Sequence, residues 1–221
     1  EAEIGAGIRK SGYDREEIFV TTKIWNDRQG YDSALEAIDE SLTRLDIDYV
    51  DLLLVHWPCP KQDKFVETWQ VFEDFLGTGR VKGIGVSNFE PAHLDALLAE
   101  SPVIPALNQV ELHPGFQQQK VREYNSAHGI LTEAWAPLSR GKLTEDAVVV
   151  GLAQKHGKSP AQVILRWHIQ LGNLVIPKTS NPDRLAENIN IFDFELDSED
   201  MQAIAGLDTG VRTSVDPNEF D

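Results

Sequence analysis

Six short apolar segments of this sequence each end in a polar or aromatic side chain. The run 50–55, for example, is followed directly by His56 and Trp57. Any one such residue could simply lie at a rim and bond a loop. Six of them at equivalent places favour a shared pocket. The positions are Lys23 with Trp25, His56 with Trp57, Ser87 with Asn88, Gln109, Trp135 and Lys178.

A lysine and a histidine in one pocket suit the chemistry of a carbonyl group. An ammonium and an imidazole can transfer a proton to a carbonyl oxygen, or stabilise the charge that develops on it. The hydroxyl of Ser87 and the amides of Asn88 and Gln109 could hold a planar carboxamide. Trp135 could stack on a flat ring. The residue types therefore indicate a carbonyl substrate and a ring-bearing cofactor.

The segment KTSNPDRLAEN (178–188) has the composition of a phosphate site. Four of its polar positions are expected at the end of a strand and the start of a helix, where free backbone N–H groups bind anions. Lysine and arginine beside such N–H groups strengthen the binding of phosphate. The four positions are Lys178, Thr179, Ser180 and Arg184.

Composition excludes several other classes of function. The net charge of −16 argues against nucleic acid, whose phosphates the surface would repel. The only cysteine, Cys59, cannot form an internal disulfide, and with His56 as its only potential partner it predicts no metal site. No apolar run reaches the ~18 residues of a membrane helix, and no signal-peptide pattern is present, so the cytoplasm is the predicted location.

Strand-like and helix-like patterns alternate along the whole chain. In the second half of the chain, Ser159 is a predicted helix cap followed by Pro160 in the first turn. Strands are predicted over 18–25, 50–57, 81–89, 105–112, 130–138 and 174–179. Helices are predicted over 31–45, 65–76, 91–100, 117–128, 146–156 and 160–171, with another from Pro182.

Strands joined by helices predict a parallel sheet, either open and doubly wound or closed as a (β/α)₈ TIM barrel. No G-x-G-x-x-G follows the first strand, which weakens the open dinucleotide-binding form. A closed barrel needs eight strands, so two are expected before Glu1, and residues 1–221 are predicted to form a single, N-terminally incomplete barrel domain. The opening residues, which look like a helix ending at Gly12, and the single methionine, Met201, favour that expectation.

Several stretches, in this order, resemble the aldo-keto reductase family over essentially the whole chain. They are GIGVSNF (83–89), NQVELHP (108–114), AWAPL (134–138), SPAQVILRW (159–167) and VIPKTSNPDRLAEN (175–188). The short loops resemble the bacterial 2,5-diketo-gluconate reductase subgroup. The resemblance implies a monomeric (β/α)₈ barrel that binds NADPH in extended form across the carboxyl-end face of the strands. It also implies transfer of a hydride from NADPH to an aldehyde or ketone.

The resemblance also implies a catalytic tetrad, of which Lys23 in TTKIW and His56 in VHWP are two members. The other two, an aspartate and a proton-donating tyrosine, are expected just upstream of Glu1. Lys23 is expected to lower the pKa of that tyrosine, and His56 to orient the substrate carbonyl. Trp25 and Trp57 are expected to line the substrate mouth.

The remaining family positions are expected to bind the cofactor, and the phosphate grip among them favours NADPH over NADH. Ser87, Asn88 and Gln109 match contacts to the nicotinamide carboxamide, and Trp135 matches the stacking aromatic. Leu138 and Ser139 lie near the pyrophosphate, Lys178, Thr179, Ser180 and Arg184 match the 2′-phosphate grip, and Glu187 and Asn188 match adenine contacts.

Two other functions stay open at this point. A barrel of the same family could bind nucleotide without turnover and act as a regulatory partner, or Lys23 could form the Schiff base of an aldolase. For a reductase, short loops predict small dicarbonyls or keto-sugars as substrates. Around the site, His113 is expected to be structural, residues 193–221 a solvated acidic surface, and Phe220 a possible pocket contact.

Overall fold

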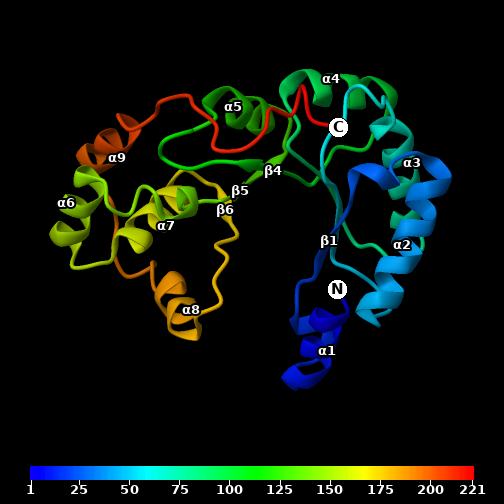
Figure 1. Cartoon of the computed structure of the whole chain (residues 1–221), viewed down its shortest axis with the longest axis horizontal. Coiled ribbons are helices and arrows are strands. Elements are labelled where there is room, and N and C mark those ends of the chain that lie inside the picture. The colour runs from blue at the N-terminus through cyan, green and yellow to red at the C-terminus, as the bar shows by residue number, and fades with distance from the viewer. The chain divides into compact units, whose positions relative to one another are not determined.

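The structure is a computed structural model that describes all 221 residues (Figure 1). None of its helices combines the length and the apolar character needed to cross a membrane. The strands are β1 (Thr21–Ile24), β2 (Leu52–Val55), β3 (Ile84–Ser87), β4 (Leu107–Glu111), β5 (Leu131–Trp135) and β6 (Leu174–Val175). The helices are α1 (Ala2–Ser11), α2 (Tyr31–Leu45), α3 (Phe65–Leu76), α4 (Pro91–Glu100), α5 (Gln119–Ala127), α6 (Ala147–His156), α7 (Pro160–Gln170), α8 (Pro182–Ile189) and α9 (Ser198–Ala205).

The chain divides into two compact units, and the first contains residues 1–108, 128–130 and 216–221. Here β1, β2 and β3 are parallel, with Ile24 opposite Val55 and Val55 opposite Val86. Helix α2 lies against both α1 and α3 (Figure 1). Its buried residues Ile38 and Leu42 are four positions apart, as an amphipathic helix requires. The register places the ends of three neighbouring strands side by side.

A glycine in β3 allows these strands to approach closely. A Cβ added to Gly85 would lie 2.8 Å from both the carbonyl oxygen of Leu107 and a methyl group of Leu54. Real Cβ atoms essentially never make contacts this short, so a larger residue would displace the strands. Gly85 is two residues before Ser87, and Leu54 is two before His56, so this packing supports the residues at the strand ends.

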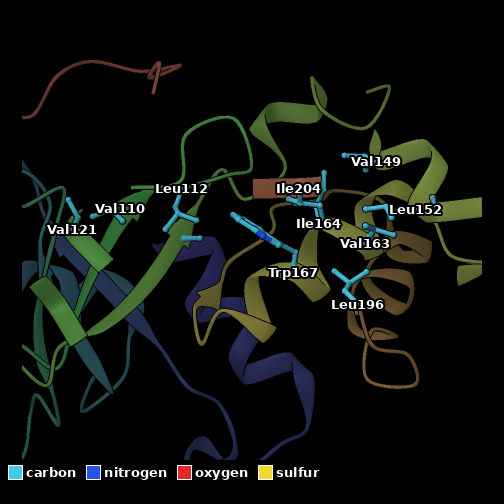
Figure 2. Close-up of a cluster of buried hydrophobic side chains, with 12 residues drawn as sticks. Val110, Leu112, Val121, Val149, Leu152, Val163, Ile164, Trp167, Leu196 and Ile204 are labelled. Atoms are coloured by element: carbon cyan, nitrogen blue, oxygen red, sulfur yellow. The ribbon is translucent and has the colours of Figure 1, made fainter. Parts of the chain in front are cut away.

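The second unit contains residues 109–127 and 131–215, and it includes the parallel pair of β5 and β6. Its apolar core joins β4 to α6, α7 and α9 (Figure 2). In Figure 2, the indole of Trp167 extends from α7 toward Leu112, the residue that follows β4, and both residues are almost fully buried. That residues 1–221 form a single domain stays a prediction.

All six strands are shorter than predicted, and two regions differ most from the sequence-based prediction. Strand β6 ends at Val175, although 174–179 was predicted, and Pro177, which has no N–H group for a ladder, follows two residues later. The region after Asp193 is not simply a solvated surface, as predicted, because it contains α9. The carboxylate of Asp200 in that helix is 3% exposed and bonds Lys155 and His156. Asp200 thereby joins α9 to α6.

Candidate active site

Lys23 and His56 come from the ends of two neighbouring parallel strands. Lys23 is paired with Leu54, which is two residues before His56, and side chains two apart lie on the same face of a strand. The backbone N–H of His56 donates to the carbonyl of Ile24 at 3.2 Å, which continues the ladder one residue past β2. The predicted ammonium and imidazole are therefore brought together on one face of the sheet.

The environment of His56 keeps its imidazole neutral. Burial lowers the pKa of His56 to about 4, and the positive charge of Lys23 contributes to the lowering. Both causes disfavour the charged form. At neutral pH the ring thus has one N–H donor and one acceptor nitrogen. Such a ring can donate a hydrogen bond to a carbonyl oxygen.

We expect NMR titration of the His56 ring to give a pKa of about 4. The unfolded chain binds its proton near pH 6.5, so it takes up more protons than the folded protein between these values. The contribution of His56 to the free energy of unfolding is therefore present above pH 6.5 and is lost as the pH falls toward 4. Lys23→Met should raise the pKa of His56. A His56 ring that titrates near 6.5 would contradict the geometry described above.

Aromatic side chains surround the imidazole and the residue after it. The rings of Trp25 and His56 meet edge to face, with centroids 4.6 Å apart, and the Trp25 side chain is 47% exposed. Trp57 is buried, and its ring lies 4.8 Å from that of Phe220, in the last segment of the chain. Phe220 thus contacts one of the two tryptophans predicted to line the substrate mouth.

Ser87 and Asn88 close β3 beside His56, and both are buried. Asn88 has a left-handed backbone conformation, with φ of 64°. Its side-chain N–H group donates to the carbonyl of His56 at 2.9 Å and to the hydroxyl of Ser87 at 3.0 Å. Asn88, a predicted cofactor contact, is therefore bonded to the backbone of His56, the predicted catalytic histidine.

In the second unit, Gln109 is on β4 and Trp135 is on β5, and these two strands are neighbours in the sheet. Gln109 is buried, and its amide donates to the carboxylate of Glu133 on β5. This bond orients the amide of Gln109. Trp135 is the last residue of β5 and is half-buried, and its carbonyl accepts from Leu112.

A cavity of about 760 Å³ opens in the second unit. Six of the predicted cofactor positions line it, which are Leu138, Lys178, Thr179, Arg184, Glu187 and Asn188. Ser139, buried in a turn, and Ser180, exposed, are not part of the lining. Arg140 and Thr144 line the cavity but were not predicted from the sequence. Arg140 joins Lys178 and Arg184 as a third cation of the lining. Its place two residues after Leu138 is the sequence signal that could have identified it.

The cavity suits an anionic group despite the net charge of −16. Lys178, Arg184 and Arg140 all contribute to its lining. Helix α8 begins beside them, and the side chain of Asn181 caps it by accepting from Asp183 N at 2.9 Å. Cations at a helix start hold phosphate. No group of three or more His, Cys, Asp or Glu side chains is placed to hold a metal ion.

The aldo/keto reductase family model matches residues 1–209, and the chain belongs to this family. This match confirms the family that the motifs indicated. It also decides between the two enzyme classes, because the family is one of reductases and not of aldolases. An aldo-keto reductase of Mycolicibacterium smegmatis is 53% identical over 220 residues, which are 100% of this chain and 80% of that protein. The glyoxal reductase of Bacillus subtilis is 46% identical over 220 residues, covering 100% of this chain and 79% of that protein.

Solved structures of relatives confirm the predicted α/β fold. A mutant of Gox0644 in complex with NADPH matches with a TM-score of 0.94 at 48% identity, over 99% of this chain and 79% of that one. A protein ascribed to the 2,5-diketo-D-gluconic acid reductase B type matches with a TM-score of 0.92 at 36% identity, over 100% of this chain and 80% of that one. The chain has the fold of the family's (β/α)₈ barrels, and the predicted subgroup is among its relatives.

Proposed function

We propose that this protein reduces small aldehydes and ketones to alcohols, with NADPH as the reductant. The observation that carries the proposal is the neutral imidazole of His56 beside the ammonium of Lys23 at the ends of adjacent strands. The glyoxal reductase of Bacillus subtilis, 46% identical, supports a small dicarbonyl as substrate. Keto-sugars belong to the same range of substrates.

His56 orients the carbonyl by donating a hydrogen bond to its oxygen, and Lys23 supplies the nearby positive charge that favours an oxyanion. Bound NADPH supplies the hydride that reaches the carbonyl carbon. The oxygen takes a proton, and the expected donor is the tyrosine of the family pattern, upstream of Glu1. Lys23 keeps the pKa of that phenol low. This donor stays a prediction.

The cavity of the second unit is the proposed site of the adenine end of the nucleotide. Lys178 and Arg184, with Arg140, would bind the 2′-phosphate in this cavity of about 760 Å³, and Glu187 and Asn188 would contact the adenine. Leu138 and Thr179 complete that contact surface. For the nicotinamide, the proposed carboxamide contacts are Ser87, Asn88 and Gln109, and the proposed stacking ring is Trp135. For the phosphates, the proposed contacts are Ser139 and Ser180.

The substrate is small because the loops beside the site are short. The connections after β1, β2 and β3 are residues 25–30, 56–64 and 88–90. Trp25, Trp57 and Phe220 supply apolar walls near His56. A pocket of this kind accepts compact carbonyl compounds and discriminates weakly among them. A monomeric state and a cytoplasmic location stay predictions.

The test is oxidation of NADPH with methylglyoxal, using protein expressed from its complete reading frame. His56→Ala should lower kcat/KM by about 10²–10³-fold, because general acid–base groups contribute about that much. His128→Ala, which changes an exposed histidine, is the matched control. Full activity in His56→Ala would remove the proposed role. Tight NADPH binding without turnover of any carbonyl would favour the alternative, a nucleotide-binding regulatory barrel.

A further inference from the structure

Two backbone carbonyls just after β2, those of His56 and Trp57, accept hydrogen bonds from side chains. Strand β2 ends at Val55, and the chain continues as His56-Trp57-Pro58-Cys59-Pro60. Buried backbone oxygens are rarely left unpaired, so these two donors complete the bonding of the segment. Both donors are side-chain amides. Asn88 donates to the His56 carbonyl at 2.9 Å, and Gln29 donates to the Trp57 carbonyl at 2.7 Å.

Gln29 is itself firmly placed. Its side chain is 3% exposed, and it follows the short 3₁₀ turn Asn26–Arg28 after β1. The next residue, Gly30, has φ of 98° and donates its N–H group to the hydroxyl of Thr68 at 2.9 Å. The same turn begins after Trp25, whose ring meets that of His56. Gln29 therefore connects the segment after β1 to the segment after β2.

We propose that Gln29 is a positioning residue for carbonyl reduction, which fixes the Trp57 carbonyl and thereby the directions of the His56 imidazole and the Trp57 indole. The inference rests on the proposed function, because it assigns Gln29 a role through His56. Gln29 is buried, and its amide is bonded to a backbone carbonyl. Its effect is on geometry, and a misplacement of about 1 Å in a reacting group costs on the order of 10²-fold in rate.

The substitution Gln29→Glu tests this bond with almost no change in shape. At neutral pH and above, the introduced carboxylate can only accept, so it would face the Trp57 carbonyl oxygen without a proton between them. When protonated, the same carboxyl has an O–H donor and can restore the bond. Burial beside a carbonyl raises the pKa of the introduced carboxyl, so the bond should return as the pH falls through the mildly acidic range.

Other groups that titrate around Gln29 do not imitate this behaviour. The thiol of Cys59 has its pKa raised to about 12 by burial, with the Asp221 carboxylate also raising it. Lys64 and Glu67 lie beside Gly30, and Asp27 and Arg28 are in the same turn. Cys59 also bonds the Gln29 side chain, but with a pKa of about 12 its thiol does not titrate between about pH 5.5 and 8. The other four groups are present in both proteins, so the ratio of variant to wild-type activity cancels their effect. The pKa of His56, about 4, keeps the imidazole neutral throughout.

The measurement is kcat/KM for methylglyoxal as a function of pH, with the dissociation constant of NADPH measured in parallel. Gln29→Glu should be about tenfold below wild type at about pH 8, since one hydrogen bond to a positioned group is lost. The ratio should rise toward one near about pH 5.5. NADPH affinity should be unchanged. Gln170→Glu is the matched control, because that partly buried amide also donates to a backbone carbonyl, that of Leu196 at 2.9 Å, at the end of α7.

A ratio for Gln29→Glu that stays flat with pH, or a parallel loss of NADPH affinity, would overturn the inference. Recovery of Gln170→Glu with the same pH profile would also overturn it. If Gln29→Glu fails to fold, Gln29→Met serves instead, with an expected loss of about tenfold at every pH, and wild-type kinetics in that variant would refute the role. A wild-type protein that reduces no carbonyl compound refutes the proposed function, which is a distinguishable outcome.

Discussion

Lys23→Met is expected to lower kcat for carbonyl reduction by about 10³-fold and to leave the dissociation constant of NADPH within about twofold of wild type. Lys23 is half-buried at the end of β1, and its charge is close enough to His56 to lower the pKa of that ring. Removing it takes away the positive charge beside the developing oxyanion. Single-turnover kinetics with pre-bound NADPH separates this loss from any change in binding.

Charge, and not side-chain volume, should account for this effect. Lys23→Arg keeps the positive charge and should recover part of the lost activity, although its planar group has a different geometry. Lys120→Met, which changes an exposed lysine on α5, should behave as wild type. Equal losses in Lys23→Met and Lys23→Arg would show that Lys23 acts through packing.

The double variant Lys178→Ala with Arg184→Ala is expected to lose most of its preference for NADPH over NADH. Both side chains line the cavity of about 760 Å³, where they are proposed to pair with the 2′-phosphate. A charge-assisted hydrogen bond contributes about 1.5–3 kcal/mol, so each residue should account for a factor of about 10–100 in kcat/KM for NADPH. Steady-state kinetics with each cofactor measures the ratio.

The activity with NADH distinguishes a lost phosphate contact from a damaged fold. Since NADH lacks the 2′-phosphate, its kcat/KM should stay within about threefold of wild type in the double variant. Lys142→Ala removes an exposed cation that lies outside the cavity lining, and it should leave both cofactors unaffected. A parallel loss with NADH would mean that Lys178 and Arg184 maintain the cavity itself.

The helices could be predicted from the sequence because their signals are local. For α4, Pro91 occupies the first turn and predicts the start of the helix, which was confirmed. For α2, the spacing of Ile38, Leu42 and Leu45 marked one buried face, and its bounds matched as well. The strands were predicted too long, because apolar runs continue into loops, as at residues 56–57 after β2. The length of a strand depends on its pairing with neighbouring strands, which the sequence does not show.

The site could be predicted only in part, for a similar reason. Lys23 and His56 were apparent because each closes an apolar run, and the structure brings them onto adjacent strands. Gln29 was missed because its partner is a backbone carbonyl 28 positions away, which no pattern of side chains reveals. Asp200 was misread as a surface acid because its partners, Lys155 and His156, are on another helix.

Hydride transfer from NADPH to the substrate can be tested with NADPH that carries deuterium at the transferred position of the nicotinamide. With methylglyoxal and wild-type protein, mass spectrometry should detect an alcohol with one deuterium on the former carbonyl carbon. With His56→Ala, the rate at which the labelled alcohol forms should fall by about 10²–10³-fold. An alcohol formed without deuterium, or no alcohol at all from protein that binds the cofactor, would contradict hydride transfer to a carbonyl group.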